Sequence, residues 1–318
     1  MTQPKKGSTV VLPSDFQSVR PLFADSQPLT CENPCGRAHA PAPSPAQVCE
    51  EAEKKLLQAI RLVRSANVTR TYTIAFSGGK DSILLDYICR EAGLHLPKVY
   101  NMTTIDPPGT IKFCSLHGCS IRRPQYSFLQ LVQMKGMPTM FHRSCCQYLK
   151  EQWIADFLMT GVRKSESVRR NKRYCSFEMT RKYPKKLSSQ ILMPLVYFSD
   201  KDVDYIIQSR QLECHPLYYD EKGCFHVERR LGCIGCPLQG DRGRADYSQY
   251  PKLLVSIAKR LIIYHRNLGR SEYDAYLNLV YVLFYSNHKY DRFLQTYQGL
   301  FSNDPKSFLE SYFQIKFP

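Results

Sequence analysis

The chain has 318 residues, of which 43% are hydrophobic, so we expect one large domain, or a domain with an appendage, that buries a real core. It carries 44 Lys and Arg against 28 Asp and Glu, and this net charge of +16 favours a polyanionic partner or a strongly anionic substrate. No apolar run reaches the length of a membrane span and the first residues lack a signal-peptide pattern, so we expect a cytoplasmic protein with no membrane partner. In a reducing compartment its 13 cysteines should be thiols or metal ligands.

Proline interrupts every regular pattern in the first part of the chain, and Ala40–Pro45 is typical of a linker. After about residue 245 the sequence becomes aromatic and helical. The predicted organisation is therefore an irregular N-terminal segment (1–45), a main domain (46–245) and a helical C-terminal subdomain (246–318).

Strand and helix patterns alternate along the main domain. Helices are predicted from Ser44 onward, after Ser77, from Tyr126 to Lys135, from Cys146 to Leu158 and after Ser199, and strands are predicted at Thr71–Phe76 and Lys98–Thr104. This alternation predicts an α/β fold, with a parallel sheet covered by helices and a C-terminal helical extension. Ligands bind beyond the carboxyl ends of such strands, so we expect Ser77, Asp106 and Gly161 to gather at one edge of the sheet.

The run Ser77-Gly78-Gly79-Lys80-Asp81-Ser82 joins the first strand to an amphipathic helix. Two glycines let the backbone turn tightly and expose its N–H groups, and the helix start adds partial positive charge. The run is not a Walker A loop, because Asp81 follows Gly79-Lys80. It predicts a site for a nucleotide phosphate, and the alternative is a plain glycine turn between a core strand and a helix.

A second motif runs from Gly161 to Arg170 and concentrates hydrogen-bond donors in a loop. Guanidinium groups such as those of Arg163 and Arg169 bind phosphate or sulfate in a bidentate manner. Glu166 and Ser167 lie between these two arginines. The alternative interpretation is a solvated basic loop, because more lysines and arginines follow.

Four cysteines form the third motif. Cys145 and Cys146 are adjacent, and Cys233 and Cys236 form a C-x-x-C pair followed by proline. C-x-x-C is a typical metal-pair spacing. Adjacent cysteines point in different directions, so the four thiols reach a bulky cluster more easily than a single ion. Structural zinc is the alternative, followed by a metal-free redox pair and by four unrelated free thiols.

These motifs resemble, in family order, those of the PP-loop ATP pyrophosphatase and PAPS reductase superfamily. The first resembles its S-G-G-x-D-S loop, the second resembles the G-[IV]-R-x-x-E-S-x-x-R segment of PAPS reductases, and Ile191–Ile206 resembles the family's P-[IL] strand and following helix. The cysteine pattern, with Lys150 just after the pair, is similar to that of [4Fe–4S] APS reductases, phage PAPS reductase-like proteins and the sulfurtransferase of DNA phosphorothioation.

The resemblance implies an adenine nucleotide alpha hydrolase-like fold, with the nucleotide-binding domain at 46–245. It implies ATP, APS or PAPS as ligand at Ser77–Ser82, and Asp106 near the adenosine or its Mg²⁺. Arg163 and Arg169 would offset phosphate charge, with Glu166 and Ser167 lining the site. Lys80 would stabilise the departing pyrophosphate, and a [4Fe–4S] cluster would be bound by the four cysteines, with zinc as second choice.

The leading hypothesis is a nucleotide-dependent enzyme that couples adenylyl transfer to sulfur transfer, with a sulfur donor or reductant protein as partner. A second is a sulfonucleotide reductase with an unusual thiol. The family places its reactive cysteine in a C-terminal Glu-Cys-Gly-x-His, whereas here no cysteine follows Cys236 and the similar Glu213-Cys214-His215 lies inside the domain. A third hypothesis is a nucleotide-binding accessory subunit of a phage or CRISPR-type complex, with nucleic acid on its basic surface.

Overall fold

A computed structural model describes residues 45–151, 153–183, 188–297 and 304–318. The predicted N-terminal segment lies almost entirely outside this described part. Ser44–Pro318 forms one compact unit, and the boundary expected near residue 245 stays a prediction. Within the described ranges, no helix is both long and apolar enough to cross a membrane.

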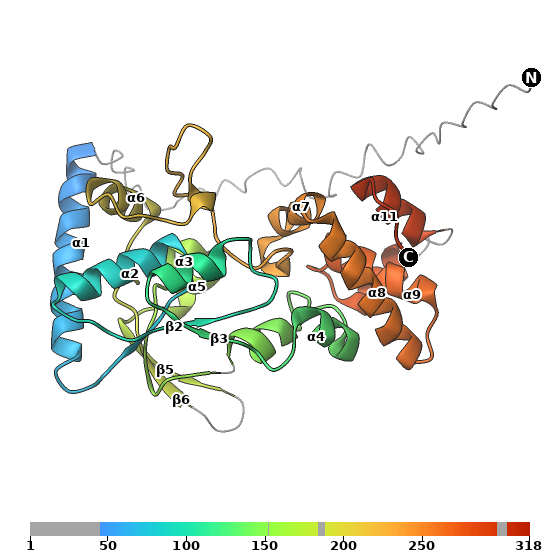
Figure 1. The fold of residues 1–318 in the computed structure, drawn as a ribbon, viewed down its shortest axis with the longest axis horizontal. Helices are drawn as coiled ribbons and strands as arrows, with labels where there is room; N and C mark the ends of the chain where they lie inside the picture. Colours follow the sequence, from blue (N-terminus) through green and yellow to red (C-terminus); the bar gives the residue numbers. More distant parts are fainter. Residues whose placement is uncertain (1–44, 152, 184–187, 298–303) are drawn as a thin grey trace, which may run out of the picture. The chain divides into compact units, whose positions relative to one another are not determined.

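The centre of the fold is a six-stranded sheet in the order β3-β2-β1-β4-β6-β5 (Figure 1). Its strands are β1 Thr73–Ala75, β2 Lys98–Asn101, β3 Ser120–Arg122, β4 Phe157–Met159, β5 Glu178–Lys182 and β6 Ser188–Leu192. All neighbours are parallel except β5, which pairs antiparallel with β6 at the edge. In the central strand, Ile74 lies opposite Lys98 on one side and Met159 on the other. The predicted α/β class is confirmed.

One face of the sheet is covered by three helices that pack on one another: α1 Pro45–Ala66, α2 Lys80–Glu91 and α6 Asp200–Ser209 (Figure 1). Their apolar residues form the main core with Ile74, for example Leu56, Leu85 and Ile206. Ser199 caps α6 by accepting a hydrogen bond from the Asp202 N–H, and the Asp202 carboxylate accepts from the Ser199 N–H. Burial of these helix faces fixes α2, and with it the glycine loop, against the sheet.

The predicted helix from Cys146 to Leu158 is wrong. Among the described residues of this range, only Cys146–Lys150 is helical, as one π-helical turn, and Phe157–Met159 forms β4 between β1 and β6. Pairing on both sides in the centre of the sheet overrides the local helical spacing. The predicted strand Lys98–Thr104 ends at Asn101, because the chain turns at Thr104, which has a left-handed φ of 62°.

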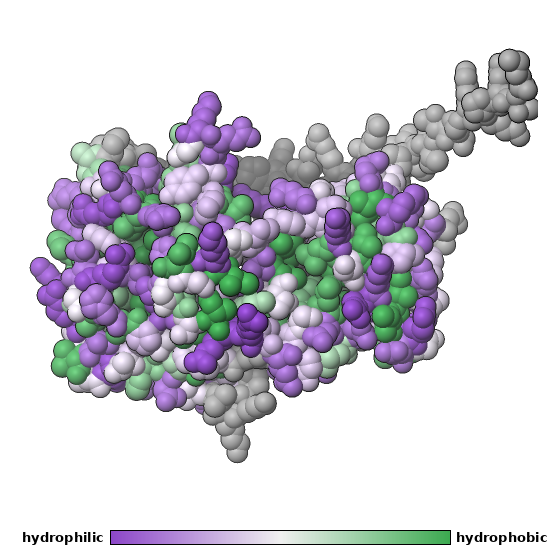
Figure 2. All heavy atoms as spheres, viewed as in Figure 1, coloured by the Kyte–Doolittle hydropathy of each residue, from purple (hydrophilic) through white to green (hydrophobic). Residues whose placement is uncertain are grey.

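The remaining helices lie around this centre. They are α3 Thr110–Leu116, α4 Phe128–Lys135, α5 Val168–Arg173, α7 Asp241–Gln249, α8 Pro251–Asn267, α9 Glu272–Phe284, α10 Tyr290–Tyr297 and α11 Pro305–Phe313. The helix α8 packs on both α4 and α9, and aromatic residues such as Tyr276 and Phe293 are buried there. The C-terminal helical extension is therefore confirmed. Figure 2 shows hydrophilic side chains over much of the viewed face, with hydrophobic residues scattered among them.

Candidate nucleotide site and cysteine centre

The glycine loop lies between β1 and α2, at the carboxyl end of the central strand. Gly78 has a φ of +72°, a conformation that favours glycine, and an added Cβ would press on the Cys114 sulfur at 3.2 Å. The Ser82 hydroxyl donates to the Gly79 carbonyl over 2.8 Å and accepts from the Ser77 N–H over 3.2 Å. Both serines therefore brace the turn.

Lys80 and Asp81 begin α2 directly after the glycines. Lys80 is 4% exposed, and its ammonium lies 3.7 Å from the Asp81 carboxylate. The chain at Gly161 passes so close that a Cβ there would lie 2.8 Å from the Asp81 carbonyl oxygen. This contact places Gly161 beside Asp81 in the glycine loop that begins at Ser77.

Arg163 is 1% exposed and lies beneath the loop. Its Nε donates to Asp81 and its Nη2 donates to Asp200, each over 2.7 Å. Burial alone would lower the pKa of Arg163, but these two carboxylates raise it, so the guanidinium is firmly charged. In this arrangement Arg163 joins the loop to the start of α6, and its expected contact with phosphate stays a prediction.

The rest of the basic motif is organised around Glu166. Its carboxylate accepts from the Arg163 N–H over 3.1 Å, forms an ion pair with Arg170 and accepts from Arg230 over 2.7 Å. The Ser167 hydroxyl caps α5, whereas Arg169 is exposed. Sequence reasoning chose Arg169 and missed Arg170, although Glu166 and Arg170 have the i,i+4 spacing of a helical ion pair.

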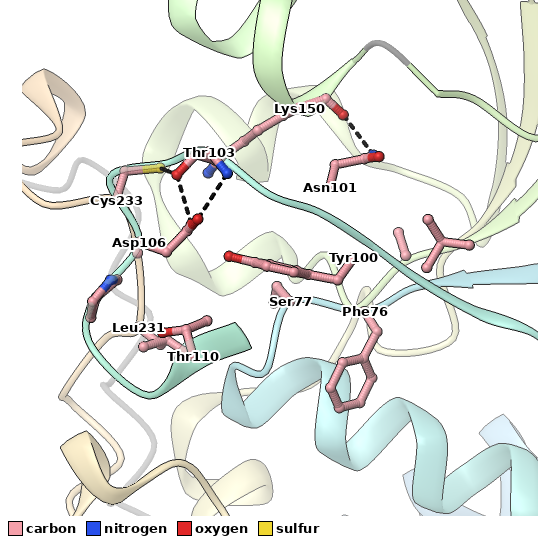
Figure 3. A pocket seen from close by; sticks show the side chains of 14 residues that line it. Phe76, Ser77, Tyr100, Asn101, Thr103, Asp106, Thr110, Lys150, Leu231 and Cys233 are labelled. Atoms are coloured by element: carbon pink, nitrogen blue, oxygen red, sulfur yellow. Dashed lines mark hydrogen bonds between the residues drawn. The ribbon is translucent and has the colours of Figure 1, made fainter. Parts of the chain in front are cut away.

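A cavity of about 190 Å³ opens beside the loop (Figure 3). Its lining includes Ser77 after β1, Tyr100 in β2, Asp106 in the following loop, Lys150 and Cys233. The glycine loop and the cysteine segments therefore contribute to the walls of one space, at the carboxyl ends of β1 and β2.

The polar groups of this cavity form a short chain. The Asp106 carboxylate accepts from the Thr103 N–H over 2.8 Å and from the Thr103 hydroxyl over 2.7 Å, and the Cys233 thiol donates to that hydroxyl over 3.5 Å. Figure 3 shows these three side chains on one wall, with the Lys150 side chain reaching toward Thr103. The Thr110 hydroxyl, also in the lining, is buried and has no hydrogen-bond partner among the described residues, so it is available to a ligand.

The four predicted cysteine ligands act on one another electrostatically. A hydrogen bond between the two adjacent thiols raises the pKa of Cys145 and lowers that of Cys146. Burial raises the pKa of Cys236. Burial would lower the pKa of Lys150, but Cys233, Cys146 and Cys236 raise it, so this ammonium is charged and neighbours both cysteine segments.

Four thiols from two segments are a soft donor set, which suits zinc or an iron–sulfur centre. However, across the described ranges no three His, Cys, Asp or Glu side chains come close enough together to hold a metal ion. Cys145 and Cys236 each interact electrostatically with the thiols of the other cysteine segment, so the four thiols share one neighbourhood. Cys146 begins a π-helical turn, a conformation frequent at functional sites.

Cys214, considered as an alternative reactive thiol, is 2% exposed. Its pKa is raised to about 12, chiefly by burial, so it is protonated at neutral pH. Burial also lowers the pKa of His215, whose Nδ1 accepts a hydrogen bond from the Leu217 N–H. The neutral imidazole therefore does not activate the neighbouring thiol.

No curated protein matches the chain. Among solved structures, the chain is similar to Candida glabrata FMN adenylyltransferase in complex with FAD and inorganic pyrophosphate, with 11% identity and a TM-score of 0.42. The match covers 61% of this chain and 66% of the adenylyltransferase, just under two thirds of that protein's length. It is also similar to phosphoadenylyl-sulfate (PAPS) reductase from Candida auris in a phosphate complex, with 13% identity and a TM-score of 0.40 over 62% of this chain and 99% of that one.

The family model of the phosphoadenosine phosphosulfate reductase domain matches residues 71–239, more than half of the chain. This range contains the glycine loop, the basic motif and all four cysteines of the third motif. The chain therefore belongs to the phosphoadenosine phosphosulfate reductase domain family.

Proposed function

We propose that the protein is a nucleotide-dependent enzyme of the PAPS reductase and ATP pyrophosphatase type. It binds ATP or an adenylyl sulfate at Ser77–Ser82, and it carries a [4Fe–4S] cluster on Cys145, Cys146, Cys233 and Cys236. The observation that carries the proposal is the shared cavity, because Ser77, Asp106, Lys150 and Cys233 line one space. Such a space would bring a nucleotide next to a metal centre.

The nucleotide part of the proposal rests on the chemistry of the loop. The Gly78 turn leads directly into the start of α2, where the partial positive charge of a helix N-terminus favours phosphate. The Asp106 carboxylate retains acceptor capacity beyond its two bonds to Thr103, which suits a ribose hydroxyl or Mg²⁺. The buried Thr110 hydroxyl offers a further polar contact to the nucleotide.

The cysteine part rests on the donor set and on Lys150. When bound, an iron–sulfur cluster supplies redox chemistry and a polarisable site for sulfur. Lys150 lines the cavity, and its charge is supported by the surrounding sulfurs. Its ammonium would therefore offset negative charge from both the thiolates and the nucleotide. Zinc on the same four cysteines is the alternative.

The proposed reaction with ATP is adenylyl transfer. An acceptor oxygen attacks the α-phosphorus, and the bond to the bridging oxygen breaks so that pyrophosphate leaves. Lys80 and the loop N–H groups stabilise the charge that develops on the pyrophosphate, and Arg163 keeps Asp81 in place. A sulfur nucleophile from a donor protein then displaces AMP from the acceptor.

One further candidate has an observation in its favour. The short helix α5 presents exposed Arg169, Lys172 and Arg173, and the chain carries a net charge of +16. These charges suit an accessory protein that binds nucleic acid without turnover. Its affinity would fall steeply with salt. The reductase alternative is weaker, because the buried, protonated Cys214 thiol lacks the mobility and thiolate character that its attack on a sulfonate requires.

The test is a panel of ATP, APS and PAPS added to anaerobically purified protein, with binding, pyrophosphate and sulfite all measured. Pyrophosphate release from ATP supports adenylyl transfer, and sulfite release from PAPS supports the reductase. We expect Lys80→Ala to weaken nucleotide binding about tenfold, or about 1.4 kcal/mol. The control is Lys112→Ala, which removes an exposed lysine of α3. Unchanged binding in folded Lys80→Ala would refute the phosphate site.

The metal is tested on the same preparations by iron, sulfide and zinc analysis. We expect brown wild-type protein with iron and acid-labile sulfide, and we expect Cys146→Ser to lose most of both. Cys175→Ser, an exposed cysteine, is the matched control and keeps the wild-type content. Colourless wild-type protein with stoichiometric zinc would refute the cluster and leave the four-cysteine site.

A further inference from the structure

A tyrosine outside the predicted motifs links the glycine loop to the second cysteine pair. Tyr218 ends the short turn Pro216–Tyr218 and is 2% exposed. Its hydroxyl oxygen accepts from the Lys80 N–H over 3.1 Å and from the Leu231 N–H over 3.3 Å. Lys80 is the first residue of α2, and Leu231 lies two residues before Cys233. One oxygen atom therefore bridges the predicted phosphate site and the C-x-x-C segment.

The two segments also pack directly on the glycines. A Cβ on Gly79 would lie 3.4 Å from the Tyr218 hydroxyl, and one on Gly78 would lie 3.3 Å from a methyl group of Leu231. The Lys80 ammonium lies 5.7 Å from the centre of the Tyr218 ring, within the range of a cation–π contact. Burial raises the pKa of Tyr218 to about 12, so the group that accepts both bonds is a neutral hydroxyl.

The N–H groups in the first turn of a helix are the ones that bind phosphate. In this structure the Tyr218 hydroxyl is the acceptor for the Lys80 N–H. A phosphate oxygen that binds this N–H must therefore displace it. A Tyr218 side chain that moves aside to admit phosphate also leaves the Leu231 N–H, because the same oxygen accepts both bonds.

We propose that Tyr218 is a positioning residue that couples nucleotide binding to the Leu231–Cys236 segment. Without nucleotide it holds that segment against the loop, and with nucleotide it releases the Leu231 N–H. The coupling rests on the nucleotide site proposed above, whereas the bridge of Tyr218 between the two segments does not.

The experiment is hydrogen–deuterium exchange of the full chain, followed in the peptide that contains Leu231, without ligand and with ATP or APS. In the wild type we expect nucleotide to speed exchange at Leu231 by about three- to tenfold, the factor expected for loss of one hydrogen bond. In Tyr218→Phe we expect exchange to be fast already without nucleotide, and to change no further when nucleotide binds. The variant is also expected to bind nucleotide about threefold or more tightly, because the competing acceptor is gone.

The matched control is Tyr219→Phe. The Tyr219 hydroxyl accepts from the Cys214 N–H over 3.2 Å and, within the described part of the chain, forms no hydrogen bond with Lys80 or Leu231, so this variant should behave as the wild type. A nucleotide-induced rise in exchange that persists in Tyr218→Phe would overturn the coupling. So would slow wild-type-like exchange in that variant without ligand. Failure of the wild type to bind either nucleotide would refute the proposed function, and the coupling with it. The exchange rate at Leu231 in Tyr218→Phe without ligand would still test the bridge.

Discussion

Replacement of Arg163 by methionine tests whether the glycine loop is braced from below. Methionine keeps much of the side-chain volume but removes the bonds to Asp81 and Asp200. Hydrogen bonds to charged groups contribute roughly 1.5–3 kcal/mol each. The Asp200 side chain is 60% exposed and regains water, so loss of its bond to Arg163 costs little. The Asp81 side chain is mostly covered, so loss of its bond carries most of the cost. We expect the free energy of unfolding to fall by about 2–4 kcal/mol.

Urea unfolding followed by circular dichroism measures this change. Arg169→Met is the matched control, because Arg169 is exposed, and its free energy of unfolding should stay within about 0.5 kcal/mol of the wild type. If Arg163→Met unfolds like the wild type but loses nucleotide affinity, then Arg163 binds phosphate directly and the brace is refuted.

Three further predictions follow from single contacts. Gly161→Ala should destabilise the fold by about 1–3 kcal/mol in urea and weaken nucleotide binding, because its Cβ would press on the Asp81 carbonyl; wild-type stability would refute this close approach. Cys214 should resist iodoacetamide in folded protein at pH 8 and react only after unfolding, as followed by mass spectrometry, because burial keeps it a thiol; rapid labelling would contradict this. The bond to Asp220 raises the pKa of His226, so the stability that His226 contributes is present below its unfolded pKa of about 6.5 and is lost as pH rises through the higher folded value. His226→Gln should therefore lose more stability at about pH 6 than at about pH 9. An equal loss at both pH values would contradict this prediction.

Local signals were sufficient for the strand, glycine loop and helix at Thr73–Glu91. The conformation there depends on neighbouring residues, namely the two glycines and the apolar face of α2. The α6 cap at Ser199 was predictable for the same reason. Strand β4 was not, because Phe157–Met159 has a helical spacing locally and becomes a strand through its pairing with β1 and β6.

The site shows the same division between local and distant contacts. The carboxyl ends of parallel neighbours meet at one edge, so sequence patterns could predict that Ser77 and Asp106 share a site. The partners of the motifs could not be predicted. Tyr218 contacts Lys80 across 138 positions, and Arg230 contacts Glu166 across 64. No spacing rule relates residues so far apart, and the carboxylates that hold Arg163 were missed for the same reason.

The central claim is that a nucleotide and a four-cysteine cluster share one cavity. Visible circular dichroism of the anaerobically purified protein, recorded while ATP or APS is added, tests this claim most directly. We predict a cluster signal that changes in a saturable manner as nucleotide binds, with the midpoint moved to higher concentration in Lys80→Ala. Colourless protein, or a cluster signal that stays unchanged while nucleotide demonstrably binds, would contradict it.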